Sequence, residues 1–297
     1  MKKEAEARGY RIVNEISEGW SGDWKYLVEK DGRKYLLRIS NISMSGRRER
    51  DFHMLQELSK SEGIKMSVPQ ELWKSDEAGK VYMIFNWIEG VKAADVIGKE
   101  SAAKKMQYGE TAGKYLRIIH QCKTLDADWE NRFGAKIDKK TAAYQRCGLT
   151  IEHDNAILNY IADNRCLLKN RPVTLQHGDY HIGNFIINPK DESLYVIDFD
   201  RMDFGDPWEE FAKIVWCKAV SKEFAYGRIR GYFAGTIPES FWRLLGLYMA
   251  FQIISSIAWA AGVSGEQVDV MMRQAKEILD DYENFSRIIP KWVDEVC

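Results

Sequence analysis

The sequence has no excess of charge, few prolines and no cysteine framework. Its 43 basic and 44 acidic residues give a formal net charge of −1, so no overall basic field would attract nucleic acid or an anionic membrane. The 5 cysteines are odd in number and form no CxxC pair, which argues against a complete disulfide framework and favours a reducing compartment. With 6 prolines and 45% hydrophobic residues, the composition is neither collagen-like nor disordered. We therefore expect a soluble cytoplasmic protein that binds neither nucleic acid nor membrane.

The sequence also lacks a secretory signal, because the N-terminal residues include acidic side chains and no apolar segment follows them. One long hydrophobic run, residues 244–265, carries no charge and reaches the roughly 18 residues that a membrane helix requires. Gln252, Ser255 and Ser256 interrupt this run, and no cluster of basic residues flanks one end to set an orientation. The run therefore predicts a buried core helix rather than a membrane span.

Local sequence patterns divide the 297 residues into two parts, in agreement with an average domain of roughly 150 residues. The first part predicts the order βββαββ, with Asp31-Gly32 as a hairpin turn between the second and third strands. The expected strands are residues 10–17, 24–30, 34–39, 70–74 and 81–87, and the expected helix is 47–60. The second part predicts amphipathic helices over residues 101–121, 138–146, 155–168, 207–220, 238–261 and 265–286. We expect an α+β fold with an antiparallel-sheet lobe, residues 1–88, and a mainly helical lobe, residues 89–297.

A cluster of polar residues interrupts the helical part between positions 172 and 206. If residues 189–193 form a five-residue hairpin loop, Asn184 and Asp198 face each other across the ladder, with Cβ atoms roughly 4.5 to 5.5 Å apart. Two oxygen donors supplied in this way suit Mg²⁺, which takes one or two protein groups besides water and substrate phosphates. An exposed polar turn is the alternative, but the apolar residues at 185–187 and 195–197 argue that the pair is enclosed.

The spacing of Asp179, Asn184 and Asp198 is that of kinase-type phosphoryl transfer. In this interpretation Asp179 accepts the proton of the attacking hydroxyl, and Asn184 and Asp198 hold Mg²⁺. Asp200 lies two positions further along an alternating strand and is a second candidate for contact with the metal or the substrate.

The segment His177-Gly-Asp-Tyr-His-Ile-Gly-Asn184 resembles the HGDxxxxN signature of the aminoglycoside phosphotransferase family. The segment Val196-Ile-Asp-Phe-Asp200, followed by Gly205-Asp-Pro207, resembles the metal-binding segment of that family. Tyr180 and Ile182 stand where the family more often has Leu and Pro. The resemblance extends over most of the chain and implies a bilobal protein-kinase-like fold. It also implies an enzyme that transfers the γ-phosphoryl group of ATP, or GTP, to a small-molecule hydroxyl with the help of Mg²⁺.

The resemblance assigns a cation and a carboxylate to the first lobe. Arg38 would contact the nucleotide phosphates where the family usually has Lys, and Asp51 would pair with Arg38 where the family usually has Glu. The alternative roles are a surface cation at a strand end and a solvated helix residue.

The resemblance also assigns backbone contacts to the nucleotide. The turn over the phosphates would offer the N–H groups of Ser21 and Gly22. In the segment that is similar to the adenine-binding hinge, the Asn86 carbonyl and the Ile88 N–H would contact the base, and Phe85 would pack behind it.

The resemblance implies an aminoglycoside as the first candidate acceptor, and with it a role in antibiotic resistance. Such a polycation requires a pocket lined by carboxylates. The acidic residues available for it are Asp203, Glu209, Glu210, Asp281 and Glu283. Relatives phosphorylate macrolides, choline and other metabolites, so a housekeeping small-metabolite or macrolide kinase is one alternative. Another is a non-catalytic nucleotide-binding pseudokinase, suggested by Arg38 and Asp51 in place of the usual Lys and Glu.

Overall fold

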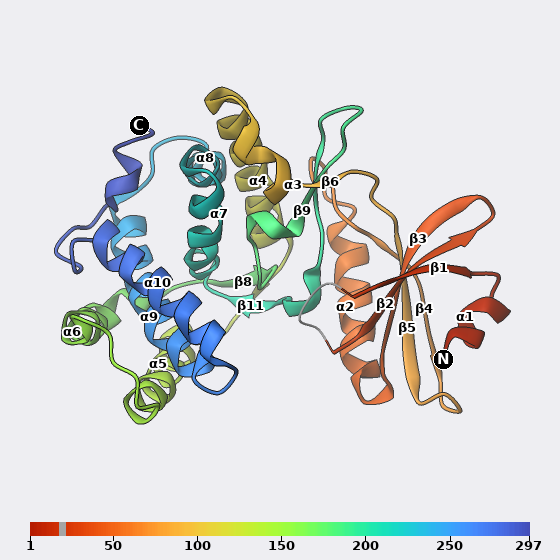
Figure 1. Cartoon of the computed structure of the whole chain (residues 1–297), viewed down its shortest axis with the longest axis horizontal. Helices are drawn as coiled ribbons and strands as arrows, with labels where there is room; N and C mark the ends of the chain where they lie inside the picture. The colour runs from red at the N-terminus through yellow and green to blue at the C-terminus, as the bar shows by residue number, and fades with distance from the viewer. Residues whose placement is uncertain (18–21) are drawn as a thin grey trace. The chain divides into compact units, whose positions relative to one another are not determined.

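The computed structural model describes residues 1–17 and 22–297, which form two compact units (Figure 1). The first unit consists of Met1–Asp95 and Asn184–Met202, and the second of Val96–Gly183 and Asp203–Cys297. An antiparallel sheet dominates the first unit and helices dominate the second, which confirms the expected α+β fold. The hairpin between Asn184 and Asp198 belongs to the sheet unit, although in sequence it interrupts the helical part.

The first unit is built on a five-stranded antiparallel sheet with the strand order β1-β2-β3-β5-β4. The strands are β1 (Arg11–Ile16), β2 (Trp24–Lys30), β3 (Arg33–Asn41), β4 (Pro69–Ser75) and β5 (Lys80–Asn86). Helix α2 (Ser45–Leu58) lies between β3 and β4 in sequence, so the predicted order βββαββ is confirmed. Asp31 and Gly32 form the predicted hairpin turn, with φ angles of 51° and 71° that suit a type I′ turn. Helix α1 (Lys2–Ala7), which precedes β1, was not expected from the sequence.

Side-chain alternation gives this sheet two different faces. The buried residues of one face, together with Ala5 of α1, are Tyr10, Tyr26, Val28, Leu37, Ile39, Trp73, Tyr82 and Ile84. On this face Trp73 and Tyr82 stack with ring centroids 4.9 Å apart. Lys25 and Arg38 alternate with these residues along β2 and β3, so their side chains leave the opposite face of the sheet. Helix α2 packs against β4 and β5 and contributes polar contacts on that second face.

The first unit also contains the predicted polar hairpin. Its strands are β9 (Phe185–Ile187) and β10 (Leu194–Val196), and β9 pairs on its other side with β6 (Val91–Lys92). Short helices complete the unit: the 3₁₀ segments η1 (Ile42–Met44) and η5 (Phe199–Arg201), and α3 (Ala93–Val96) at its boundary.

The register of this hairpin differs by one residue from the predicted one, because Val196 pairs with Phe185. Residues 188–193 connect the strands, and the N–H at position 188 donates to the carbonyl at position 193 at 2.9 Å, which closes a four-residue loop, residues 189–192, one residue shorter than expected. Asn184 and Asp198 therefore lie beyond the strand ends, and the prediction that they face each other across the ladder is wrong.

The second unit consists mainly of helices. They are α4 (Ala102–Cys122), α5 (Trp129–Arg146), α6 (Asp154–Asn164), α7 (Ile214–Val220), α8 (Lys222–Phe233), α9 (Glu239–Ala260) and α10 (Gly265–Asp281). A small antiparallel sheet has the order β11-β8-β7, from β7 (Thr124–Leu125), β8 (Val173–Gln176) and β11 (Asp203–Gly205). Its 3₁₀ segments are η2 (Ile97–Lys99), η3 (Arg165–Leu168), η4 (Ile182–Asn184), η6 (Glu209–Lys213) and η7 (Lys291–Val293). The helix expected over 207–220 is divided into η6 and α7, and α8 was not predicted.

Helix α9 contains most of the long hydrophobic run. Among the described residues it is the one helix that is long and apolar enough to cross a membrane, judged by length and composition alone. In the structure 72% of its most apolar window is buried, and it packs against α5, α6 and α10 of the same unit. The run is therefore a helix of the unit's core, as the sequence analysis expected.

Helices α4 and α8 approach each other so closely that glycine is required at their contact. A Cβ atom at Gly109 or Gly113 of α4 would overlap backbone atoms of α8. Likewise, a Cβ atom at Gly227 or Gly231 of α8 would overlap backbone atoms of α4. Within each helix the two glycines are four residues apart, which places them on the same face.

We expect Gly113→Ala to destabilise the protein, because the new methyl group would overlap the Arg228 carbonyl oxygen and push the two helices apart. Overpacking of this kind costs about 1 to 3 kcal/mol and occasionally more. Gly265→Ala at the start of α10 is the control, since no atom lies within 4 Å of the position that its Cβ would take. Urea unfolding followed by circular dichroism measures both variants. A free energy of unfolding for Gly113→Ala equal to that of the native protein would contradict the close helix contact.

Candidate active site

The predicted general base, Asp179, follows strand β8 in the second unit. Its N–H donates to His177 Nδ1 at 3.2 Å, and Gly178 before it has a φ of 83°, which glycine adopts without strain. The Asp179 carboxylate lies 3.7 Å from His181 Nε2 and 3.8 Å from Lys213 Nζ. Since 23% of the side chain is exposed, this carboxylate is accessible to a substrate and is flanked by two basic groups.

A buried carboxylate anchors the loop that carries Asp179. Glu210 is 3% exposed and accepts the backbone N–H groups of His177 at 2.8 Å and Gly178 at 2.7 Å. Its Oε2 also lies 3.2 Å from His120 Nε2. Burial acts to raise the pKa of Glu210, but the contacts with His120 and His177 together outweigh burial and hold the pKa below its ordinary value. Glu210 is therefore a loop anchor, and its assignment to the acceptor pocket is corrected.

We expect Glu210→Gln to flatten the acid side of the pH–stability curve. The pKa of Glu210 in the folded protein lies below the ordinary 4.5, so the stability from its ionised form is complete above about pH 4.5 and is lost as the pH falls through the folded pKa. The native protein should therefore lose Tm more steeply below about pH 4.5 than Glu210→Gln does. Thermal unfolding across this range measures the difference, with Glu77→Gln on an exposed turn as the control. Parallel native and Glu210→Gln curves would contradict the assignment.

Two more buried charged residues support the loop. Arg228 of α8 has no exposed surface and donates to the Tyr180 carbonyl at 2.8 Å and the Glu210 carbonyl at 2.9 Å. Asp206 is also fully buried; its carboxylate accepts the Trp208 N–H at 2.8 Å, and its carbonyl accepts Gln176 Nε2 at 2.8 Å at the end of the strand that leads into the loop. The sequence analysis missed Arg228, whose one signal is a basic residue among the apolar positions of residues 224–233.

The predicted metal ligands flank the hairpin strands of the first unit. Asp198 has a φ of 63°, and its carboxylate lies 3.5 Å from Lys25 Nζ and is 33% exposed. The Asn184 carbonyl accepts the Ile197 N–H at 3.0 Å, which joins the backbones beside the two predicted ligands. Within residues 1–17 and 22–297, no group of three or more His, Cys, Asp or Glu side chains could hold a metal. One carboxylate and one amide fit Mg²⁺, whose other ligands are water and phosphate oxygens.

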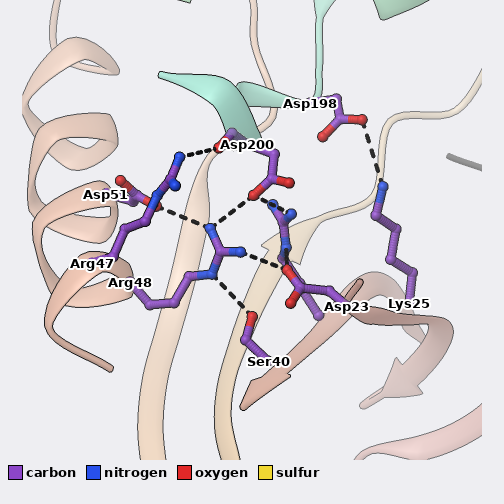
Figure 2. A network of polar contacts seen from close by, with 9 residues as sticks. Asp23, Lys25, Ser40, Arg47, Arg48, Asp51, Asp198 and Asp200 are labelled. Atoms are coloured by element: carbon purple, nitrogen blue, oxygen red, sulfur yellow. Dashed lines mark hydrogen bonds and ion pairs between the residues drawn. The ribbon is translucent and has the colours of Figure 1, made fainter. Parts of the chain in front are cut away.

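Figure 2 shows a network of ion pairs around Arg48 in the first unit. Arg48 of α2 is buried and lies 2.6 Å from Asp23, 3.1 Å from Asp51 and 2.8 Å from Asp200. Its Nε donates to Ser40 Oγ at 3.0 Å. Arg48 was not expected from the sequence, because an arginine on a polar helix has no local signal that distinguishes it from a solvated residue.

The network changes the partners predicted for Arg38. Arg38 is buried; its Nε donates to Asp23 at 2.5 Å and its Nη2 pairs with Asp200. Asp51 pairs instead with Arg48, one turn earlier in the same helix. An aspartate is one methylene shorter than the usual glutamate. Arg48 links Asp51 to the two carboxylates that pair with Arg38. The direct Arg38–Asp51 pair that the sequence analysis expected is thus replaced by this network.

Asp200 has the contacts of a counter-ion in this network. It lies in η5 rather than on an alternating strand, which corrects the geometry predicted for a second metal ligand. Burial acts to raise the pKa of the Asp200 carboxyl. The opposite effect of Arg38 and Arg48 is larger, so the pKa lies below its ordinary value. For Asp51 the effect of burial on the pKa is larger than the opposite effect of Arg48, so the pKa is raised.

The other residues assigned to the nucleotide remain predictions. Phe85 is buried and Asn86 ends strand β5, where Asn86 Oδ1 accepts a backbone N–H at 2.5 Å. Ile88 follows the strand and is partly buried, and Gly22 is exposed. Ser21 lies outside the described residues.

The five-stranded sheet unit, the helical unit and the anchored loop after β8 define a phosphotransferase with a protein-kinase-like fold. A profile of the phosphotransferase enzyme family matches residues 12–242, and the chain belongs to this family. The resemblance found in the sequence is thereby confirmed, and the chain is an enzyme of the class that transfers a phosphoryl group to a hydroxyl. Among curated proteins no relative matches the chain.

Solved structures share the fold at low sequence identity. The GDP complex of a wild-type aminoglycoside 2′-phosphotransferase has a TM-score of 0.65 at 14% identity, over 90% of this chain and 92% of that one. A choline/ethanolamine kinase family protein from Mesorhizobium loti has a TM-score of 0.63 at 17% identity, over 97% of both chains. A spectinomycin phosphotransferase in complex with ADP and spectinomycin has a TM-score of 0.55 at 15% identity, over 99% of this chain and 93% of that one. These likenesses establish the fold.

Proposed function

We propose that the protein phosphorylates a hydroxyl group of a small molecule, with Mg²⁺ and ATP or GTP as the phosphoryl donor. The observation that carries the proposal is the Asp179 carboxylate, which is 23% exposed on a loop whose two preceding N–H groups are held by buried Glu210. The similar solved structures contain nucleoside diphosphates, GDP in one and ADP in another, which supports the proposal that this protein binds a nucleotide.

In the proposed reaction Asp179 accepts the proton of the acceptor hydroxyl as the hydroxyl oxygen bonds to the γ-phosphorus. Glu210 and Arg228 keep the loop in place, so the carboxylate does not have to be ordered during the reaction. Asn184 and Asp198 would hold Mg²⁺, which neutralises charge on the transferring phosphoryl group when bound. Positioning and charge supply most of the acceleration, because a loose transition state needs little covalent help.

The acceptor has two candidates, and the first is an aminoglycoside, as in similar solved structures. The acidic residues that a polycation would need are already paired with bases in the second unit. Asp203 lies 3.0 Å from Arg132, and Asp281 lies 2.5 Å from Lys218. Glu209 likewise lies 3.0 Å from Lys136, and Glu283 lies 3.9 Å from Arg287. This pairing favours the second candidate, a hydroxylated metabolite with little positive charge.

A nucleotide-consumption assay separates these candidates. It would present aminoglycosides, macrolides, choline and neutral hydroxylated metabolites in turn, with ATP or GTP, in Mg²⁺ and in a chelator. We expect consumption that requires both Mg²⁺ and one acceptor class, and that is lost in Asn184→Ala. Tight nucleotide binding without turnover on any acceptor would instead support a nucleotide-binding pseudokinase.

A further inference from the structure

We infer that Lys25 of β2 is a phosphate-binding residue of the nucleotide site and that Arg38 of β3 serves mainly to hold the network together. This inference rests on the proposed function and changes the residue that the sequence resemblance assigned to the phosphates. The two residues are cross-strand partners in the register of β2 and β3, so both side chains leave the same face of the sheet. The position in the sheet therefore suits either residue, and their contacts distinguish them.

Arg38 already has two carboxylate partners. Its side chain is 8% exposed and bridges Asp23 and Asp200, which also bind buried Arg48. A phosphate that took the place of one of these carboxylates at the Arg38 guanidinium would disturb the network. The displaced carboxylate would leave Arg48 with an incomplete set of partners, and breaking a buried ion pair in this way is costly.

Lys25 differs in its partner and in the strength of its contact. Its side chain is 12% exposed, and its Nζ lies 3.5 Å from Asp198, farther than the 2.6 Å between Arg48 and Asp23. Asp198 is the carboxylate proposed to hold Mg²⁺. Mg²⁺ held by Asp198 would bring the nucleotide phosphates to this carboxylate, so the ammonium group of Lys25 would lie near them.

Charge balance explains how Lys25 changes partners. In the structure Asp198 supplies the negative charge that compensates the largely buried Lys25 ammonium group. With Asp198 holding the metal, Lys25 would need a new counter-charge, because a buried charge without a partner is unfavourable. A phosphate oxygen supplies that charge. Lys25 would thus contact the nucleotide without disturbing the ion pairs of Arg38.

The test is calorimetry of Mg·ATP and Mg·GTP binding to the native protein and to Lys25→Met, Lys25→Arg and Lys74→Met. Lys74 on edge strand β4 is exposed and serves as the charge-matched control. A hydrogen bond to a charged group contributes about 1.5 to 3 kcal/mol, so we expect Lys25→Met to weaken nucleotide binding by roughly 10- to 100-fold. Lys25→Arg should recover part of the affinity, and Lys74→Met should bind as the native protein does.

Thermal unfolding without nucleotide separates a binding role from a structural one. Arg38→Met should lower Tm strongly because it breaks the network, whereas Lys25→Met should unfold near the native Tm. Native-like affinity in folded Lys25→Met would overturn the inference while leaving the proposed function intact. Absence of Mg²⁺-linked nucleotide binding in the native protein would overturn both.

Discussion

Asp179→Asn should lower kcat of the acceptor-dependent reaction by about 10²- to 10⁴-fold, or roughly 3 to 6 kcal/mol of barrier, as expected for loss of a general base. The amide has the size of the carboxylate but cannot take up the hydroxyl proton. The backbone contact of residue 179 with His177 Nδ1 does not involve the changed group. Nucleotide affinity should therefore stay near the native value while turnover is lost.

The matched control for this variant is Asp163→Asn on the exposed surface of α6 in the same unit. It removes the same charge by the same isosteric change and should keep native turnover. Steady-state kinetics on the acceptor found in the screen measure both variants. Turnover of Asp179→Asn within a few-fold of native would exclude Asp179 as the base and would also remove the observation on which the proposed function depends.

Asp198→Asn should remove most of the Mg²⁺ dependence of nucleotide binding and lower kcat by about 10²- to 10³-fold, or roughly 3 to 4 kcal/mol. This is the size of effect seen when one pre-positioned electrostatic group is lost. Asparagine keeps the shape and one oxygen donor of residue 198 but gives up the negative charge that attracts the cation. The variant also removes the ion-pair partner of Lys25, so nucleotide affinity without Mg²⁺ should change little or rise.

Calorimetry of ADP binding with and without Mg²⁺ measures this effect. Asp191→Asn in the exposed loop of the same hairpin is the control, because it removes one negative charge away from the proposed ligand set. Equal Mg²⁺ enhancement of ADP binding in Asp198→Asn and in the native protein would reject Asp198 as a metal ligand. The position of the metal would then have to be sought elsewhere in the first unit.

The features predicted correctly from the sequence are local ones. Alternating apolar residues and the Asp31-Gly32 turn indicated the βββαββ order, because strand and hairpin preferences depend on a few neighbouring residues. The family was recognised from the segment between His177 and Asp198, where residue spacing alone is informative. The hairpin register was missed by one residue because the connecting loop is one residue shorter than expected, a length that composition does not specify.

The contacts that hold the site together were not predictable in the same way. Glu210 reaches back to a loop more than thirty positions earlier, with separations of 33 and 32 residues to His177 and Gly178. Arg48 forms an ion pair with Asp200, which lies 152 positions later in the sequence. A charged side chain on a helix looks the same in sequence whether water or a buried carboxylate is its partner.

The order of residues alone determined the class of fold, the family and the candidate base and metal ligands, since each depends on short-range spacing. Only the folded chain decided that Arg38 pairs with Asp23 and Asp200 and that Lys25 stands beside Asp198. The physical reason is that burial and ion pairing depend on which distant segments are brought into contact. The strength of a charge–charge interaction in turn depends on that burial.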